Sequence, residues 1–281
     1  MIEDFAAWVR GLPPADGRVY LEKIDGAYRL WVDHPRSRNA LGPQMMVQLG
    51  ELVAALPPGP VIIQGAGGTF CSGGNLDALK EHLGEPRAGR VFGGYMHRVA
   101  LALRSRREPV VALVEGVALG GGAELAMAAH AVVAVPSARI GFVQARLGVS
   151  PGFGGGRWLC ERIGPVATAR LLAEAALEPV VEGALVQRVS ESPVEAAVAL
   201  AEELSRDPNR MAPKHWENPS DGELERAMDV QGLDATVRAG ILRIARAAAG
   251  DREPALKVEL EVFDGLWGGP VHRAALERVR R

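Results

Sequence analysis

The chain has 281 residues, of which 48% are hydrophobic and 23% charged, and its formal net charge is −2. A chain of this length buries enough surface to fold without disulfide or metal staples, and its balanced charge argues against a nucleic-acid-binding surface as its main feature. The two cysteines, Cys71 and Cys160, make neither a disulfide framework nor a C-x-x-C metal motif, so we expect a reduced, cytoplasmic setting.

No segment is expected to target or cross a membrane. Residues 1–14 begin with acidic side chains and lack the apolar stretch of a signal peptide. The longest apolar tract, residues 109–136, is rich in glycine and is interrupted by Glu115, Glu124 and His130. This tract is therefore predicted to be a buried part of the core rather than a membrane span.

Alternating side chains predict a β-hairpin near the start of the chain. Residues 19–24 and 28–32 each alternate apolar and polar side chains, and Asp25-Gly26 between them is a turn signal. Apolar residues at helical spacing then predict a helix over residues 39–56, which ends at the proline-rich residues 57–60.

Short buried strands alternate with helices along the next part of the chain. Continuous apolar runs predict strands at residues 61–63, 109–114 and 131–135, and helical spacing predicts helices at about 90–104 and 122–129. This alternation favours an α/β core built from repeated ββα units.

Helical spacing dominates from residue 193 onward, with predicted helices at residues 196–204, 223–228, 236–248 and 256–267. We therefore divide the chain into two parts. Residues 1–192 form the core that is expected to bind the substrate, and residues 193–281 form a helical C-terminal region that is expected to mediate oligomerisation.

Patterns typical of nucleotide, hydrolase and metal sites are incomplete in this chain. It has neither a G-x-G-x-x-G fingerprint nor a P-loop. Residues 148–152 match the hydrolase elbow G-x-S-x-G, but Pro151 lacks the N–H that an oxyanion donor needs. The six histidines show no i, i+4 pairing, so no metal site is expected, and His130 is interpreted as a core residue. Cys71 is interpreted as a buried filler rather than a reactive thiol.

Two glycine-rich segments, residues 69–76 and 115–125, each follow a buried strand. A strand that enters a glycine turn and then a helix leaves free backbone N–H groups at the positive end of the helix. Two such turns facing each other would form an oxyanion hole, with Glu124 in the first turn of the second helix. The alternative is that these glycines only permit tight packing and that Glu124 only complements the helix dipole.

Three motifs, in this order and spacing, resemble the crotonase (enoyl-CoA hydratase/isomerase) superfamily: TFCSGGNL at 69–76, EGVALGGGAEL at 115–125 and IGFVQARLGVSPGFGG at 140–155. RNAL at residues 38–41 matches its N-terminal signature. The resemblance implies a spiral-like α/β fold with a helical C-terminal region, assembled as a homotrimer or hexamer. It also implies an acyl thioester of coenzyme A or of an acyl carrier protein as substrate, and no cofactor beyond the coenzyme A that the substrate carries.

The resemblance also assigns expected roles to individual residues. The oxyanion donors would be the N–H groups of Gly74 and Gly121, and Glu124 falls on one of the two acid/base glutamates of the hydratases. The residues expected to line the pantetheine and adenine are Ala40, Leu41, Ser72, Asn75 and Leu76, with Arg38 as a candidate phosphate contact.

The position of the second hydratase glutamate holds Gln144. An amide positions water but does not shuttle a proton, which puts ordinary hydration in doubt. Decarboxylation of a malonyl-type thioester needs no base to start, and a neutral residue here avoids repelling the carboxylate of the substrate. RNALGPQMM at 38–46, GGGAEL with GFVQARLG, and WGGP at 267–270 are also similar to the ethylmalonyl-CoA decarboxylases of this superfamily.

Three hypotheses about function stay open at this point. The first is an enolate-forming lyase that decarboxylates a short branched malonyl-type thioester such as ethylmalonyl-CoA or methylmalonyl-CoA. The alternative is an enoyl-CoA hydratase, dehydratase or isomerase in which Glu124 alone carries the proton and Gln144 orients water or substrate. The third is a non-catalytic oligomer that binds acyl thioesters.

Overall fold

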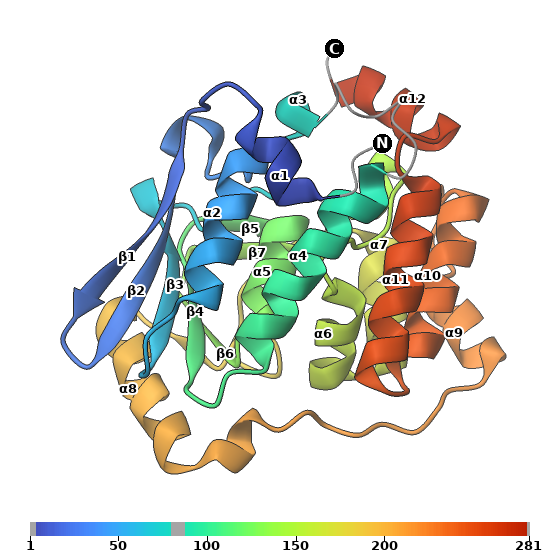
Figure 1. Ribbon diagram of the computed structural model, residues 1–281. Helices are drawn as coiled ribbons and strands as arrows, with labels where there is room; N and C mark the ends of the chain where they lie inside the picture. Colours follow the sequence, from blue (N-terminus) through green and yellow to red (C-terminus); the bar gives the residue numbers. More distant parts are fainter. Residues whose placement is uncertain (1–3, 80–87, 280–281) are drawn as a thin grey trace.

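The computed structural model describes residues 4–79 and 88–279, so residues 1–3 of the N-terminal segment analysed above lie outside it. Over the described residues the chain forms two sheets surrounded by helices (Figure 1). The larger sheet has the order β1-β2-β3-β4-β6-β9. Its strands are β1 (Arg18–Ile24), β2 (Ala27–Asp33), β3 (Val61–Gly65), β4 (Val110–Val114), β6 (Ala131–Ala134) and β9 (Arg188–Val189).

The predicted hairpin and the three predicted buried strands are confirmed. β1 and β2 pair antiparallel, with Val19 opposite Val32, and Gly26 occupies the turn with φ of +73°, which glycine adopts without strain. From β2 onward the neighbouring strands of this sheet pair in parallel, and β3, β4 and β6 match the predicted strands to within two residues.

Both faces of the central strands are covered, which explains their unbroken apolar sequences. On β3, Val61 and Ile63 belong to the main core, to which α2 (Pro43–Ala54), α4 (Ala88–Arg104) and α5 (Gly121–Ala128) contribute. Ile62 points to the opposite face and packs in a separate apolar cluster with Leu200 of α8 (Pro193–Arg206). Of the helices on the main-core face, α4 and α5 contribute residues to the candidate site.

The helix predicted over residues 39–56 begins later than expected, at Pro43. Arg38 and Asn39 have φ of +53° and +58°, outside the helical region. The Asn39 side chain accepts a hydrogen bond from the His34 N–H at 2.7 Å and donates one to the Thr69 carbonyl at 2.6 Å. These bonds favour a turn over a helix at this point, and Pro43 is suited to the first helical position.

The second sheet has the order β5-β7-β8 and is not predicted by the sequence pattern. Its strands, β5 (Val117–Leu119), β7 (Arg139–Gly141) and β8 (Leu177–Pro179), are three residues long, too short to show a period. The sheet joins two segments that matter for function, because the Gly120 N–H donates to the Gly141 carbonyl at 2.9 Å. It thereby sets the start of α5 beside the turn that carries Gln144.

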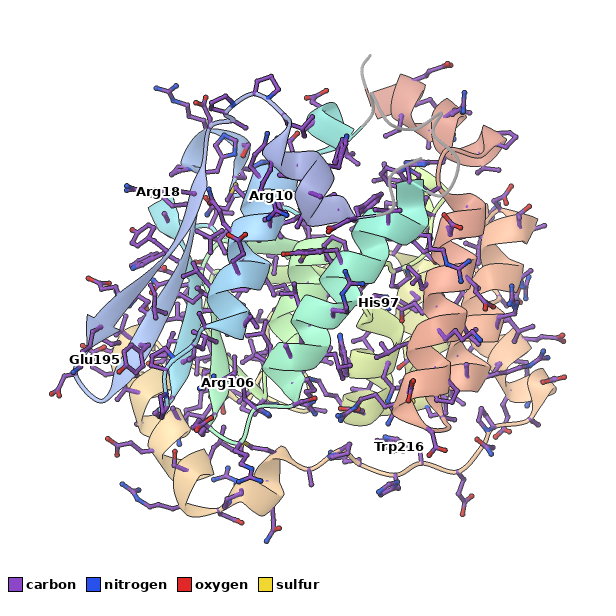
Figure 2. The ribbon with its side chains drawn as sticks, in the orientation of Figure 1. Arg10, Arg18, His97, Arg106, Glu195 and Trp216 are labelled. Carbon is purple, nitrogen blue, oxygen red and sulfur yellow. The ribbon has the colours of Figure 1, made fainter. Side chains whose placement is uncertain are left out.

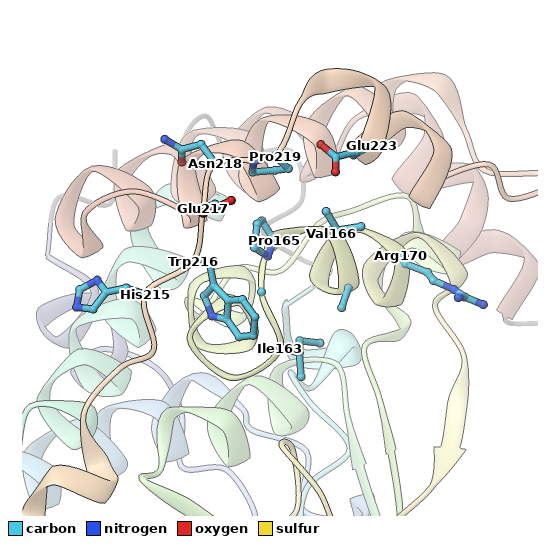
Figure 3. A pocket seen from close by; sticks show the side chains of 12 residues that line it. Ile163, Pro165, Val166, Arg170, His215, Trp216, Glu217, Asn218, Pro219 and Glu223 are labelled. Carbon is cyan, nitrogen blue, oxygen red and sulfur yellow. The ribbon is translucent and has the colours of Figure 1, made fainter.

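The predicted C-terminal helices are confirmed as α8, α9 (Asp221–Ala227), α10 (Ala235–Ala248) and α11 (Arg252–Leu266), and α12 (Pro270–Val279) follows them. α8 packs on the large sheet, whereas α10 and α11 pack against α4, α6 (Gly155–Ile163) and α7 (Pro165–Glu174). The extended segment between α8 and α9 carries Trp216, which lies against Gly164 at the junction of α6 and α7 (Figures 2 and 3). The C-terminal helices therefore reach the core at two separate places.

Two further α-helices are short, α1 (Phe5–Arg10) and α3 (Leu76–Leu79), and 3₁₀ helices cover Pro35–Ser37, Ala66–Gly68, Val143–Leu147 and Pro208–Met211. Within residues 4–79 and 88–279, no helix combines the length and the apolar character needed to span a bilayer.

Candidate active site

The two glycine-rich segments lie side by side. We call residues 69–76 the first glycine turn and residues 115–125 the second glycine turn. The Cys71 N–H donates to the Val117 carbonyl at 3.1 Å, and the Leu119 N–H donates to the Cys71 carbonyl at 2.9 Å. A Cβ at Gly73 would lie 2.9 Å from the Leu119 oxygen and 3.3 Å from the Gly121 nitrogen, so glycine permits this close approach.

This arrangement leaves two neighbouring backbone donors at one cavity. Gly121 is the first residue of α5, before the first intrahelical bond from the Glu124 N–H to the Gly120 carbonyl. Neither the Gly74 N–H nor the Gly121 N–H donates to any residue that the structure describes, and both glycines line the same cavity. With the positive end of α5 behind them, the two groups are suited to an oxygen that becomes negative.

Glu124 is buried, with 2% of its surface exposed, and its carboxylate is held by backbone N–H groups. Oε2 accepts from the Phe153 N–H at 2.6 Å and from the Gly155 N–H at 2.9 Å, and Oε1 accepts from the Gly152 N–H at 3.2 Å. A Cβ at Gly155 would lie 2.6 Å from Glu124 Cγ. The glycine at 155 therefore makes room for the carboxylate.

The pKa of Glu124 is raised to about 8, first because burial strips the charged form of its hydration. The charge of Glu259 raises this pKa further, while the N–H groups of Phe153, Gly155 and Gly152 lower it. A carboxyl group with a pKa in this range holds a proton near neutral pH and is able to deliver it.

Gln144 lies directly beside Glu124. It is carried by the 3₁₀ turn Val143–Leu147, is 7% exposed, and donates from Nε2 to Glu124 Oε1 at 2.8 Å. The Gln144 Oε1 is buried and has no hydrogen-bond partner among the described residues. The site thus pairs one carboxyl group with one neutral amide.

Glu124, Gln144 and the two glycine turns line one cavity of about 100 Å³. Its remaining walls are mostly apolar and include Phe92 of α4, Phe263 of α11 and Trp267. A larger hollow, about 760 Å³ around Arg170 and Trp216, shares no lining residue with it (Figure 3). We place the candidate active site at the smaller cavity because the titratable carboxyl group and the free N–H groups meet there.

Two of the other six predicted substrate-binding residues line this cavity and four do not. Ser72 and Leu76 line the cavity, whereas Arg38, Ala40, Leu41 and Asn75 do not. Leu41 is fully buried and donates its N–H to the Gly73 carbonyl at 2.7 Å, so it positions the first glycine turn. The Arg38 carbonyl accepts from the Ser72 N–H at 3.0 Å. Asn75 Oδ1 accepts from the Ala78 N–H at 3.2 Å, at the start of α3.

Residues that the sequence analysis set aside are engaged in the core. Burial raises the pKa of Cys71 to about 12, so its thiol stays protonated. His130 accepts from the Val110 N–H at Nδ1, and its Nε2 lies 3.1 Å from the Arg104 carbonyl, as a core histidine would. Ser150, in the elbow-like sequence, donates from Oγ to the Pro151 carbonyl.

Sequence reasoning missed the residues that hold Glu124 in place. The backbone donors lie in Gly152–Gly156, where the run of glycines was an available signal. The second buried carboxylate, Glu259, sits on an amphipathic helix, where a glutamate looks like an exposed residue. Phe92 and Phe263 look like ordinary core residues, because apolar periodicity does not tell a cavity wall from close packing.

Residues 25–229 match the enoyl-CoA hydratase/isomerase family. The chain belongs to this family. The resemblance to the crotonase superfamily inferred from the motifs, and with it the crotonase-type α/β fold, is confirmed. The family acts on acyl-CoA thioesters, so the cavity lined by Glu124 lies in an enzyme scaffold of that class.

Individual relatives are named either as decarboxylases or as hydratases. The chain is 32% identical to the ethylmalonyl-CoA decarboxylase of Gallus gallus, over 95% of this chain and 85% of the relative. It is 37% identical to a probable enoyl-CoA hydratase of Mycobacterium tuberculosis, over 60% of this chain and 68% of the relative. An enoyl-CoA hydratase/isomerase structure from Mycobacterium paratuberculosis superposes with a TM-score of 0.71 at 20% identity, over 92% of this chain and 97% of that one.

Proposed function

We propose that the protein decarboxylates a short branched malonyl-type thioester, such as ethylmalonyl-CoA or methylmalonyl-CoA. The observation that carries this proposal is the pair formed by Glu124 and Gln144, one carboxyl group of raised pKa and one neutral amide 2.8 Å apart. A hydratase needs two groups that move protons, whereas a decarboxylase needs one. The similarity to ethylmalonyl-CoA decarboxylases over nearly the whole chain supports the same choice.

In the proposed reaction, the bond between the α-carbon and the carboxylate carbon breaks and carbon dioxide leaves. The electron pair of this bond moves into the thioester carbonyl, whose oxygen becomes negative and is stabilised by the N–H groups of Gly74 and Gly121. Glu124 then transfers its proton to the α-carbon, which gives the shorter acyl thioester. The carboxylate of Glu124, held by the N–H groups of Gly152, Phe153 and Gly155, then regains a proton from water.

Gln144 fits both protonation states of Glu124. When Glu124 is ionised, Nε2 of Gln144 donates to it, as observed. When Glu124 carries its proton, the unpartnered Oε1 is able to accept it after the amide turns over, and the NH₂ group then faces the cavity. A donor at this position stabilises the carboxylate of the substrate, where a second glutamate would repel it.

Hydration or isomerisation is a second candidate, favoured by the similarity to the mycobacterial probable hydratase. In this case Glu124 alone carries the proton and Gln144 orients the water or the substrate. The two candidates differ in the substrate that reacts, since only the decarboxylase needs a carboxylated acyl group.

We also propose that the substrate is carried by coenzyme A or by an acyl carrier protein, and that no other cofactor takes part. We further propose a cytoplasmic homotrimer or hexamer in which the core, residues 1–192, binds the thioester and the C-terminal region, residues 193–281, mediates assembly. The resemblance to the superfamily supports the carrier and the assembly, and the cysteine usage, with Cys71 and Cys160 both free and buried, supports the cytoplasmic setting.

The test is mass spectrometry of the purified protein incubated with ethylmalonyl-CoA, methylmalonyl-CoA and crotonyl-CoA. Loss of carbon dioxide from a malonyl thioester, abolished in Glu124→Ala, is the expected result. Gain of water on crotonyl-CoA with the malonyl thioesters intact would instead favour the hydratase. Binding of the thioesters with no reaction in any of them would contradict both candidates for these acyl groups.

A further inference from the structure

The carboxylate of Glu124 shares its backbone donors with a second buried carboxylate, Glu259 of α11. Glu259 has no exposed surface; its Oε1 accepts from the Gly154 N–H at 2.7 Å and its Oε2 accepts from the Gly156 N–H at 2.9 Å. We call the backbone N–H groups of residues 152–156 the amide cradle. Along the cradle, donors 152, 153 and 155 serve Glu124, and donors 154 and 156 serve Glu259.

The cradle lies at the start of α6, where backbone N–H groups have no acceptor within the helix. These free donors explain why the cradle binds carboxylates. Gly154 is the N-cap of α6 and has no side chain that could accept from the first turn, so the two glutamates satisfy those N–H groups. A Cβ at Gly156 would lie 2.9 Å from Glu259 Oε2, so this glycine makes room for Glu259 as Gly155 does for Glu124.

Two carboxylates on adjacent donors disfavour each other's ionisation, because little water is present to screen them. The N–H groups and the positive end of α6 offset part of this repulsion. From α4, His97 is 6% exposed and its Nε2 lies 3.5 Å from Glu259 Oε1, so His97 faces Glu259 (Figure 2 marks His97). From the other sides the neutral Gln144 contacts Glu124, and the backbone and Cβ of Cys71, whose thiol is protonated, lie against Gly122.

We infer that Glu259 is a positioning residue for Glu124, which holds the amide cradle in shape and, by its negative charge, makes Glu124 retain the proton that it delivers. Each Glu259 oxygen accepts one hydrogen bond from the cradle, so Glu259 fixes the Gly154 and Gly156 N–H groups beside those that hold Glu124. Glu259 does not line the cavity and acts through the cradle. The inference rests on the proposed role of Glu124 as a proton donor.

The test follows the titration of Glu124 by infrared difference spectroscopy, without substrate. The carboxylic acid band of Glu124 is identified by its loss in Glu124→Gln and is then followed against pH in Glu259→Gln. Removing the charge of Glu259 is expected to lower the titration midpoint of Glu124 by about one pH unit, a tenfold change in proton affinity. An unmoved midpoint in the folded variant would overturn the inference.

Two further variants separate charge from structure. Glu261→Gln removes the same charge from the same helix at a position that is 39% exposed, and is expected to leave the midpoint unchanged. Glu259→Asp keeps the charge, and it provides the titration test if Glu259→Gln does not fold. It is expected to keep the midpoint within about half a pH unit of the wild type. A tenfold fall in proton affinity in Glu259→Asp would assign the effect to the shape of the cradle and contradict a role for the charge.

The same variants distinguish this inference from the proposed function. If malonyl thioesters are decarboxylated, the fall of kcat at high pH moves to lower pH in Glu259→Gln, whereas a merely structural role lowers kcat equally at every pH. If the midpoint shifts in the infrared titration but no thioester loses carbon dioxide, the inference about Glu259 holds and the proposed function fails.

Discussion

Two glycine-rich stretches of this protein begin helices, and they use their backbone N–H groups in opposite ways. At the start of α5, the Gly121 N–H and the neighbouring Gly74 N–H face a cavity and donate to none of the described residues. At the start of α6, all five N–H groups of the amide cradle donate to Glu124 or Glu259.

The difference shows that glycine content and helix position do not by themselves make a ligand site. Both stretches combine small residues with the positive end of a helix, which favours an anion. At α6 the carboxyl groups of Glu124 and Glu259 occupy that place, whereas at α5 the Gly74 and Gly121 N–H groups face the cavity, where the proposed reaction places the thioester oxygen. In the proposed reaction, the filled stretch positions the proton donor and the open stretch stabilises the enolate.

The largest expected effect comes from replacing Glu124, whose carboxyl group the filled stretch holds. Glu124→Gln removes the proton donor and is expected to lower turnover by about 10²–10⁴-fold, while thioester binding stays close to that of the wild type. Steady-state kinetics and calorimetric binding of the product thioester measure the two quantities. Turnover at the wild-type rate would show that Glu124 is not the donor. In the active wild type, kcat is expected to fall as pH rises through about 8, because the protonated form is lost.

The next effect tests the open stretch. Gly121→Pro removes the N–H of Gly121 and is expected to lower kcat by about 10²–10³-fold, the usual cost of one oxyanion donor. A Cβ at this position would lie 2.5 Å from Phe153, so Gly121→Ala is the matched control, with the same added bulk and an intact N–H. Equal loss in the two variants would assign the effect to crowding and remove the oxyanion hole from the mechanism.

A smaller effect is expected at Gln144, which donates to Glu124. Gln144→Glu places a second carboxyl group beside Glu124 and is expected to raise KM for a malonyl-type thioester about tenfold by repulsion, which corresponds to about 1.4 kcal/mol. Crotonyl-CoA has no acyl carboxylate, so its dissociation constant is expected to change little. Tighter binding of the malonyl thioester would contradict the charge argument.

The smallest effect lies outside both stretches and concerns stability. Burial, helped by the charge of Arg104, lowers the pKa of His130 to about 4, so His130 stabilises the fold above its unfolded pKa, and this stability is lost as pH falls toward 4. Between pH 7 and about pH 5.5 the loss is about 1 kcal/mol of unfolding free energy.

His130→Asn is expected to flatten this acid-side slope in urea titrations, and the same change at the exposed His215 serves as the control. The pKa of Glu124 is shifted upward, so its contribution to stability has the opposite sign and falls as pH rises toward 8. An unchanged slope in His130→Asn would show that His130 is not the group that titrates.

Much of the fold was predictable because it is written in local patterns. The alternation in β1 and β2, the continuous apolar runs of β3, β4 and β6, and the helical spacing of α10 and α11 all matched the structure to within a few residues. The start of α2 and the small sheet did not follow the pattern, since they depend on Asn39 bonds across the chain and on strands of three residues.

The sequence by itself determined the family, the two glycine turns and the identities of Glu124 and Gln144. All of these follow from short motifs whose chemistry depends on residue type and spacing. Only the tertiary structure decided which N–H groups stay free and which are occupied. Glu259 lies 135 residues from Glu124 along the chain, and the two carboxylates share one cradle only because α11 packs against α4 and α6. Burial and neighbouring charge set the pKa of a carboxyl group, and both depend on contacts that no local pattern records.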